Sequence, residues 1–72
     1  MEIRYDASAD AAYISFLGEN EDAAFGFTYG CDTAQIGGQI HLDFDADGRL
    51  IGIEVLQAGL LLPKSCLAGR ST

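Results

Sequence analysis

Residues 39–56 read QIHLDFDADGRLIGIEVL and contain the clearest structural pattern of this 72-residue chain. Alternate positions are apolar on both sides of the Asp47-Gly48 pair. Such period-two alternation indicates a strand with one buried face, and Asp-Gly between two strands is typical of a tight hairpin turn. The stretch therefore predicts a β-hairpin at the centre of the fold.

The alternation also predicts how the two strands of this hairpin pair. If Asp47 and Gly48 form a two-residue loop, all the apolar residues share one face, in the pairs Ile40 with Val55, Leu42 with Ile53, and Phe44 with Ile51. The opposite face then carries His41 opposite Glu54 and Asp43 opposite Gly52. A loop one residue longer would set Ile40 against Glu54, so the hydrophobic pattern favours the two-residue loop.

The same hairpin matches the calcium-loop pattern D-x-D-x-D-G-x5-E. Carboxylates and a backbone carbonyl at Arg49 could supply oxygen ligands for a hard cation. An EF-hand also needs a helix on each side, whereas residues 33–42 contain two adjacent glycines and residues 51–56 are β-branched and alternating. We interpret the motif as an acidic turn and keep metal binding as an alternative. Its candidate ligands are His41, Asp43, Asp45, Asp47 and Glu54.

The rest of the chain adds strands before this hairpin. Residues 2–6 and 11–17 alternate around the turn-forming sequence DASAD, which predicts a first hairpin. In the next strand Phe25, Phe27 and Tyr29 alternate with small residues, so we expect their rings on one side, in the core.

The predicted fold is mainly β, α+β at most: a five-stranded antiparallel meander sheet with the central 39–56 hairpin. Pro63 could begin a short C-terminal helix that turns Leu67 towards the sheet. Three consecutive leucines before it cover either this sheet or a neighbouring subunit. We expect residues 1–72 to form a single domain with a frayed tail at 68–72.

Size and composition bear on partners. A chain this short buries a thin core, although 49% hydrophobic residues are too many for a disordered chain. We therefore expect a homodimer or larger homo-oligomer. The net charge of −7 argues against nucleic acid and anionic membranes, which attract Lys and Arg, and permits a basic protein partner.

Targeting and redox features are few. The N-terminus shows no signal peptide and the leucine-rich run is far shorter than a membrane span, so we expect a cytoplasmic protein. Cys31 and Cys66 lack CxxC spacing and are expected to be reduced. No pattern indicates a cofactor.

Two blocks of the sequence resemble a known family. IRYDASADAAYISF at the N-terminus is followed by IHLDFDADGRLIGIEVLQA, and together they resemble the small prokaryotic family catalogued as domain of unknown function 2283. The resemblance implies the hairpin rather than an EF-hand, and it carries over no catalytic residues. For some members it implies the role of the smaller partner in a two-gene toxin and antitoxin arrangement.

Three functional hypotheses follow. The first is a small non-catalytic domain that self-associates and binds a protein in an antitoxin-like manner. The second is a metal-binding protein that uses the acidic hairpin of residues 43–54. The third is a small enzyme with a site at an oligomer interface, in which Asp6 and Asp10 beside His41 would act as acid and base.

Overall fold

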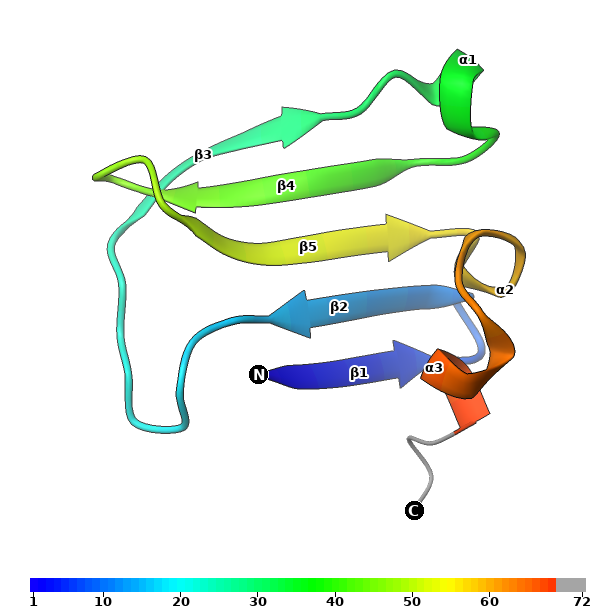
Figure 1. The fold of residues 1–72 in the computed structure, drawn as a ribbon, viewed down its shortest axis with the longest axis horizontal. Helices are drawn as coiled ribbons and strands as arrows, with labels where there is room; N and C mark the ends of the chain where they lie inside the picture. The colour runs from blue at the N-terminus through cyan, green and yellow to red at the C-terminus, as the bar shows by residue number, and fades with distance from the viewer. Residues whose placement is uncertain (69–72) are drawn as a thin grey trace.

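The structure, a computed structural model, describes residues 1–68 and contains one five-stranded antiparallel sheet with three short helices (Figure 1). The predicted mainly β class is therefore confirmed. The strands are β1 (Glu2–Asp6), β2 (Ala11–Ser15), β3 (Phe25–Gly30), β4 (Ile40–Asp45) and β5 (Leu50–Leu56). The helices are α1 (Thr33–Ile36), α2 (Ala58–Leu61) and α3 (Lys64–Ala68).

The order of the strands differs from the predicted meander. It is β1-β2-β5-β4-β3, so β5 lies between the two hairpins and β3 forms the far edge. The connection from β2 to β3 passes around one end of the sheet instead of joining neighbours (Figure 1). β5 takes the inner position because its alternate residues match those of β2, with Val55 opposite Ala12 and Ile53 opposite Ile14.

The predicted register of the central hairpin is correct for four pairs. Ile40 lies opposite Val55, His41 opposite Glu54, Leu42 opposite Ile53 and Asp43 opposite Gly52. The next pair is Phe44 with Leu50, because a β-bulge places one extra residue on β5 at this point. The predicted two-residue loop is therefore wrong. The loop is one residue longer, and the bulge restores the pairing that the apolar pattern requires.

The longer loop follows from the chemistry of Asp45. Its carboxylate Oδ1 accepts hydrogen bonds from the backbone N–H groups of Asp47 at 2.9 Å and Arg49 at 2.8 Å. Its backbone carbonyl accepts from the N–H of Gly48 at 3.0 Å, and Gly48 has a φ of 84°. A glycine at this position reaches the left-handed region without steric cost. Asp45 and Gly48 together explain the D-x-D-G pattern as a turn motif.

A second bulge changes the orientation of the aromatic strand. Phe25 pairs with Asp45 of β4, whereas Phe27 pairs with Phe44, the residue next to Asp45 on the same strand. Because neighbouring residues of a strand point to opposite faces, Phe25 and Phe27 lie on opposite sides of the sheet. A side chain at Gly26 would overlap the backbone carbonyl of Asp45, so only glycine fits the bulge. The expectation of three core aromatic residues is wrong, since Phe25, Phe27 and Tyr29 are 62%, 52% and 59% exposed.

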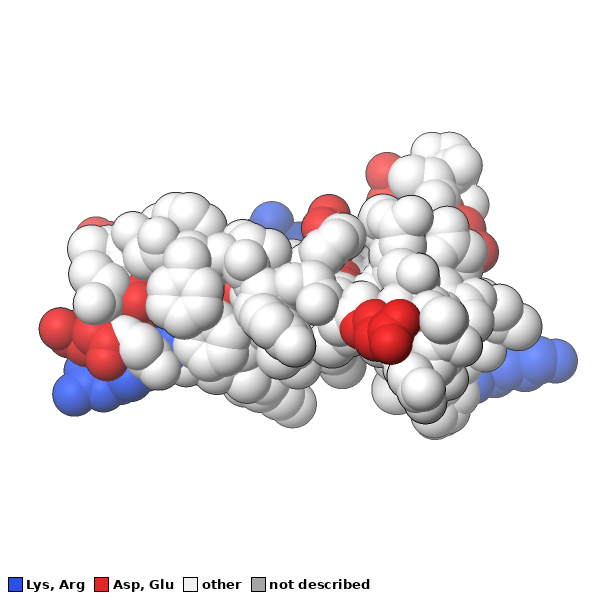
Figure 2. Space-filling model, turned by 90° about the horizontal axis from the view of Figure 1, so that it is seen from above, with Lys and Arg blue, Asp and Glu red and all other residues white. Residues whose placement is uncertain are grey.

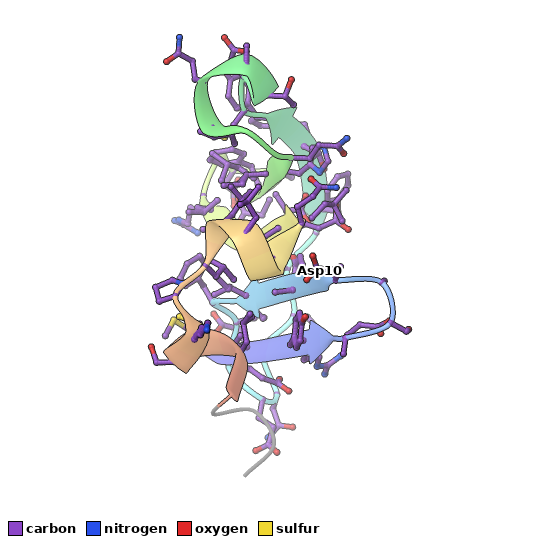
Figure 3. The ribbon with its side chains drawn as sticks, turned by 90° about the vertical axis from the view of Figure 1, so that its right-hand side faces the viewer. Asp10 is labelled. Atoms are coloured by element: carbon purple, nitrogen blue, oxygen red, sulfur yellow. The ribbon has the colours of Figure 1, made fainter. Side chains whose placement is uncertain are left out.

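Helices α2 and α3 lie at one end of the sheet, on the same side of it (Figure 3). The predicted helix after Pro63 is confirmed as α3, whereas α1 and α2 were not predicted. Leu61, Leu62 and Leu67 pack against the core of their own chain, but Leu60 is 72% exposed. Ala68 ends α3, and the rest of the predicted frayed tail lies outside the described residues.

The core is very small. Among the described residues, the fully buried hydrophobic ones are Ala12, Val55 and Ala58, which join β2, β5 and α2. Tyr5, Ile40 and Ile53 and the three helix leucines surround them. Towards the other end of the same face the side chains are more exposed, and Phe27 stacks on Phe44 with ring centroids 4.8 Å apart.

Asp10 holds α2 against the sheet (Figure 3). Its carboxylate Oδ1 accepts hydrogen bonds from the Tyr5 hydroxyl at 3.0 Å and from the N–H of Gly59 at 2.9 Å. Its backbone carbonyl accepts from the N–H of Ala58 at 2.9 Å. Asp10 adopts a φ of 51°, a left-handed conformation that Asp and Asn tolerate better than other residues with a β-carbon.

We expect Asp10→Ala to lower the free energy of unfolding by about 2–4 kcal/mol. The substitution removes the two hydrogen bonds of the carboxylate, and alanine tolerates the positive φ at this position less well than aspartate does. Asp10→Asn retains an oxygen acceptor and the tolerance of positive φ, so it is the matched control and should lose less than half as much. Urea unfolding followed by far-UV circular dichroism at one fixed protein concentration measures both. Equal stability of the alanine variant and the parent would contradict this role.

Candidate functional site

The polar face of the sheet brings together residues that the sequence singled out. His41 on β4 and Glu54 on β5 are cross-strand partners, and His41 Nδ1 lies 3.1 Å from Glu54 Oε1. The predicted attraction between them is confirmed. Both side chains are partly exposed, at 33% and 47%, so the pair is accessible to solvent.

A hydrogen-bonded network beside this pair was not predicted. The Tyr13 hydroxyl donates to Asp43 Oδ2 at 3.0 Å, and Thr28 Oγ1 donates to Asp43 Oδ1 at 2.7 Å. Burial and then the hydrogen bond to Asp43 raise the pKa of Tyr13 above its ordinary value. The Tyr13 ring lies over Gly52, where a β-carbon would overlap its hydroxyl. The network ties β2 and β3 to β4 across the polar face.

Few of the candidate metal ligands lie close to one another. Both carboxylate oxygens of Asp43 are bound by Tyr13 and Thr28, and Asp45 Oδ1 is bound by the backbone of its own turn. Asp47 is exposed and points towards Arg49 at 3.9 Å. Among residues 1–68, no group of at least three His, Cys, Asp or Glu side chains is arranged to hold a metal ion. His41 and Glu54 are thus the two candidate ligands that approach each other.

The strands on both sides of the acidic motif also decide against an EF-hand. Ile40–Asp45 and Leu50–Leu56 are paired strands, whereas an EF-hand requires a helix before and after its loop. The structure contains an acidic turn at this motif, as we interpreted it from the sequence.

The residues of the enzyme hypothesis do not converge. Asp6 Oδ1 accepts hydrogen bonds from the hydroxyl and N–H of Ser8 within its own turn. Asp10 lies beside Tyr5 and α2, where Tyr5 packs against the core. His41 follows Ile40, which also packs against the core, so His41 points to the opposite face of the sheet. Within one chain, these three side chains are therefore not placed to act together as acid and base.

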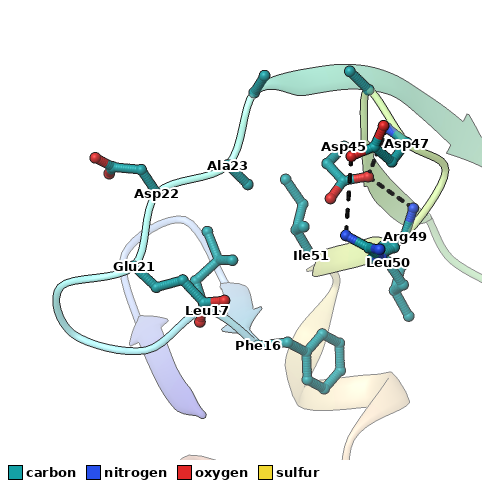
Figure 4. A pocket seen from close by; sticks show the side chains of 12 residues that line it. Phe16, Leu17, Glu21, Asp22, Ala23, Asp45, Asp47, Arg49, Leu50 and Ile51 are labelled. Carbon is teal, nitrogen blue, oxygen red and sulfur yellow. Dashed lines mark hydrogen bonds and ion pairs between the residues drawn. The ribbon is translucent and has the colours of Figure 1, made fainter.

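A cavity of about 380 Å³ opens between the β2–β3 connection and the acidic turn (Figure 4). Its acidic lining residues come from two separate segments, Glu21 and Asp22 from the connection and Asp45 and Asp47 from the turn. The lining also includes Arg49 and a group of apolar side chains, which are Phe16, Leu17, Leu50 and Ile51. Sequence reasoning treated the two acidic segments as separate exposed loops, because their proximity depends on the strand order.

The outer edge of β3 is the other surface of note. We call Phe25, Phe27 and Tyr29 of this strand the aromatic edge. All six residues of β3 are exposed, and none of them is charged. Figure 2 looks onto this side of the molecule and shows mainly uncharged side chains, with some acidic ones among them and Lys and Arg at the periphery. An uncharged, exposed edge strand is unusual, because such edges pair readily with other strands.

The comparisons with known proteins give one result. The family model described as "Protein of unknown function (DUF2283)" matches residues 2–58. The chain belongs to the DUF2283 family. The match covers all five strands and ends in α2, so it includes both Asp10 and the central hairpin. The searches of curated proteins and of solved structures found no match.

Two further features bear on the sequence predictions. Cys31 and Cys66 are unbridged and partly buried. Within residues 1–68, no helix has the length and apolar character that crossing a membrane requires.

The Tyr13 network predicts a strong coupling between two positions. Gly52→Ala displaces the Tyr13 hydroxyl and should lower the free energy of unfolding by about 1–3 kcal/mol. In a Tyr13→Ala background the added methyl group meets no ring, so the same substitution should cost little. A double-mutant cycle by urea unfolding measures the coupling. The same cost for Gly52→Ala in both backgrounds would show that the ring does not occupy this space.

The turn of Asp6 predicts a pH effect. The Ser8 hydroxyl, followed by the N–H groups of Ala9 and Ser8, lowers the pKa of Asp6 below its ordinary value. Because the pKa is lower in the folded state, the stabilisation is complete above the ordinary carboxyl pKa and disappears as the pH falls through the folded-state value. Ser8→Ala should raise this pKa in a carboxyl-carbon NMR titration, whereas Ser65→Ala, on α3, should not. An Asp6 pKa that Ser8→Ala leaves unchanged would contradict the assignment.

Proposed function

We propose that this DUF2283 chain is a non-catalytic module that self-associates through the aromatic edge. The observation that carries the proposal is the exposure of Phe25, Phe27 and Tyr29 on an uncharged edge strand. Monomeric proteins normally protect such strands with charge, proline or a covering element. A second strand laid along β3 would shield both the rings and the edge backbone from water.

The dimensions of the fold support the same conclusion. The backbone measures 33 × 32 × 17 Å, which corresponds to a single sheet with helices over one end. With three fully buried hydrophobic residues in the part of the chain that the structure describes, the core contributes little apolar burial of its own. Small domains of this kind gain stability from association, disulfides or metals, and the two cysteines are not bridged.

The exposed aromatic area is large enough to matter. A Phe or Tyr side chain offers about 150–250 Å². At the observed exposures, the aromatic edge leaves about 350 Å² per chain, or about 700 Å² for two copies. Specific interfaces bury about 1,200–2,000 Å² in total, and the edge backbone and neighbouring apolar side chains can supply the difference.

Self-association is tested by sedimentation velocity over a range of protein concentrations. The parent should sediment as a dimer or larger species, and Phe27→Glu should weaken association at least tenfold, because it places a charge on the edge. Leu60→Glu is the matched control, since Leu60 is also an exposed apolar residue, at 72%, but lies on α2. A parent protein that remains monomeric throughout the micromolar range would contradict the proposed function.

A second candidate function is antitoxin-like binding of a basic protein. The cavity beside the acidic turn favours it, because four acidic residues line it together with apolar ones. A Lys or Arg of a partner could place its aliphatic stem on the apolar surface and its charge among the carboxylates. The net charge of −7 would also attract a basic partner before contact.

Native mass spectrometry on the protein isolated from its own host tests this second candidate. We expect a stoichiometric complex with a basic polypeptide that dissociates as salt rises and that Asp22→Lys prevents. Glu19→Lys makes the same change of charge in the same connection but outside this cavity, so it should leave the complex intact. A homo-oligomer without a companion, or equal loss in both variants, would count against the cavity as the binding site.

A further inference from the structure

The sequence of β3 is nearly symmetric about its centre. Residues 26–30 read Gly-Phe-Thr-Tyr-Gly, so an aromatic residue and then a glycine lie on each side of Thr28. When two copies of a strand pair antiparallel about a twofold axis, each residue meets the one at the mirrored position. An axis at Thr28 would therefore set aromatic residues opposite aromatic residues and glycine opposite glycine.

The hydrogen bonds of β3 show which backbone groups are free to pair. The N–H of Cys31 donates to the carbonyl of Ile40 at 2.9 Å, just beyond the end of β3. Antiparallel ladders alternate, so Tyr29 and Phe27 also bond to β4, opposite Leu42 and Phe44. The N–H and C=O groups of Thr28 and Gly30 consequently point away from β4, towards the outside of the sheet.

The two faces of the strand also suit a second copy. Phe27 and Tyr29 lie on the apolar face, opposite Phe44 and Leu42, and Thr28 lies on the polar face, opposite Asp43. Thr28 is already oriented by its hydrogen bond to Asp43. Gly26 and Gly30 carry no side chain that could obstruct an approaching strand.

We propose that β3 pairs antiparallel with β3 of a second copy about a twofold axis at Thr28, so that two sheets become one continuous sheet. This inference rests on the proposed self-association and specifies its geometry. Thr28 then forms a hydrogen-bonded pair with Thr28 of the second copy. Phe27 lies opposite Tyr29 of the second copy in a non-hydrogen-bonded pair, where side chains approach most closely.

Charge explains why the occupant is a second copy and why β3 is the edge used. The opposite edge, β1, bears Glu2 and Arg4, which form an exposed ion pair at 3.1 Å and hinder the approach of another strand. A chain with a net charge of −7 repels its own copies, and this repulsion is least where the strand itself is uncharged. The near-symmetry of residues 26–30 gives a second copy a match that an unrelated strand lacks.

Disulfide trapping tests the register. In a background with Cys31→Ser and Cys66→Ser, Thr28→Cys should form a covalent dimer under mild oxidation, because residues facing each other in a hydrogen-bonded pair have Cα atoms about 5.5 Å apart. Thr33→Cys, at the start of α1, is the matched control and should react at least tenfold more slowly. Equal or faster dimer formation by the control would overturn the register.

Amide hydrogen exchange tests the pairing without any substitution. Raising the concentration of the parent protein should slow exchange at Thr28 and Gly30 at least tenfold, since their N–H groups enter the new ladder. If the chain dimerises while these amides still exchange rapidly, the edge pairing is wrong but self-association stands. If no association is detected at any concentration, both are wrong. If protection appears only with a different protein bound, the second copy is the wrong occupant.

Discussion

The contact between Asp10 and α2 determines which part of the apolar face of the sheet is covered by helices and which part stays exposed. Asp10 lies where the first hairpin turns, and its carboxylate and carbonyl bind the N–H groups at the start of α2. Helix α2 has four residues, too few to be stable alone, and its N-cap, Gln57, makes no side-chain capping bond. Asp10 supplies hydrogen bonds from a distant part of the chain, which places Ala58 on Ala12 and Val55.

Everything that covers the sheet follows from this placement. Once α2 is fixed, Leu61 and Leu62 reach the core, and the chain continues through Pro63 into α3, which adds Leu67. The helices are too short to extend over the whole face, so β3 remains bare. The same arrangement therefore explains both the small core and the exposed aromatic edge on which the proposed function depends.

Sequence reasoning succeeded where a pattern is local and repeated. The alternation in β4 and β5 predicted their pairing because a shift by one residue would move every apolar side chain to the wrong face. It failed on the loop, because the carboxylate of Asp45 stabilises a longer turn, and a bulge at Ile51 accommodates the difference. It failed on the orientation of Phe25 because the bulge at Gly26 depends on contact with Asp45, on another strand.

The candidate site shows the same limit. The pairing of His41 with Glu54 was predictable from the hairpin alone, whereas the Tyr13 contact with Asp43 requires knowing that β2 lies beside β5. Local patterns do not encode strand order, and so the acidic cavity and the bare edge of β3 were also missed. One signal was present in the sequence: residues 25–30 contain three aromatic residues and no charged residue, whereas edge strands are normally protected by charged residues or proline.

The most direct test of this account is a nuclear Overhauser measurement between the methyl groups of Ala12 and Ala58. These two residues are 2% and 0% exposed and come from β2 and α2, which the hydrogen bonds of Asp10 join. The account predicts a strong cross-peak between the two methyl groups in the parent protein. A sheet that shows the cross-strand contacts of β2 with β5 but no Ala12–Ala58 cross-peak would contradict it.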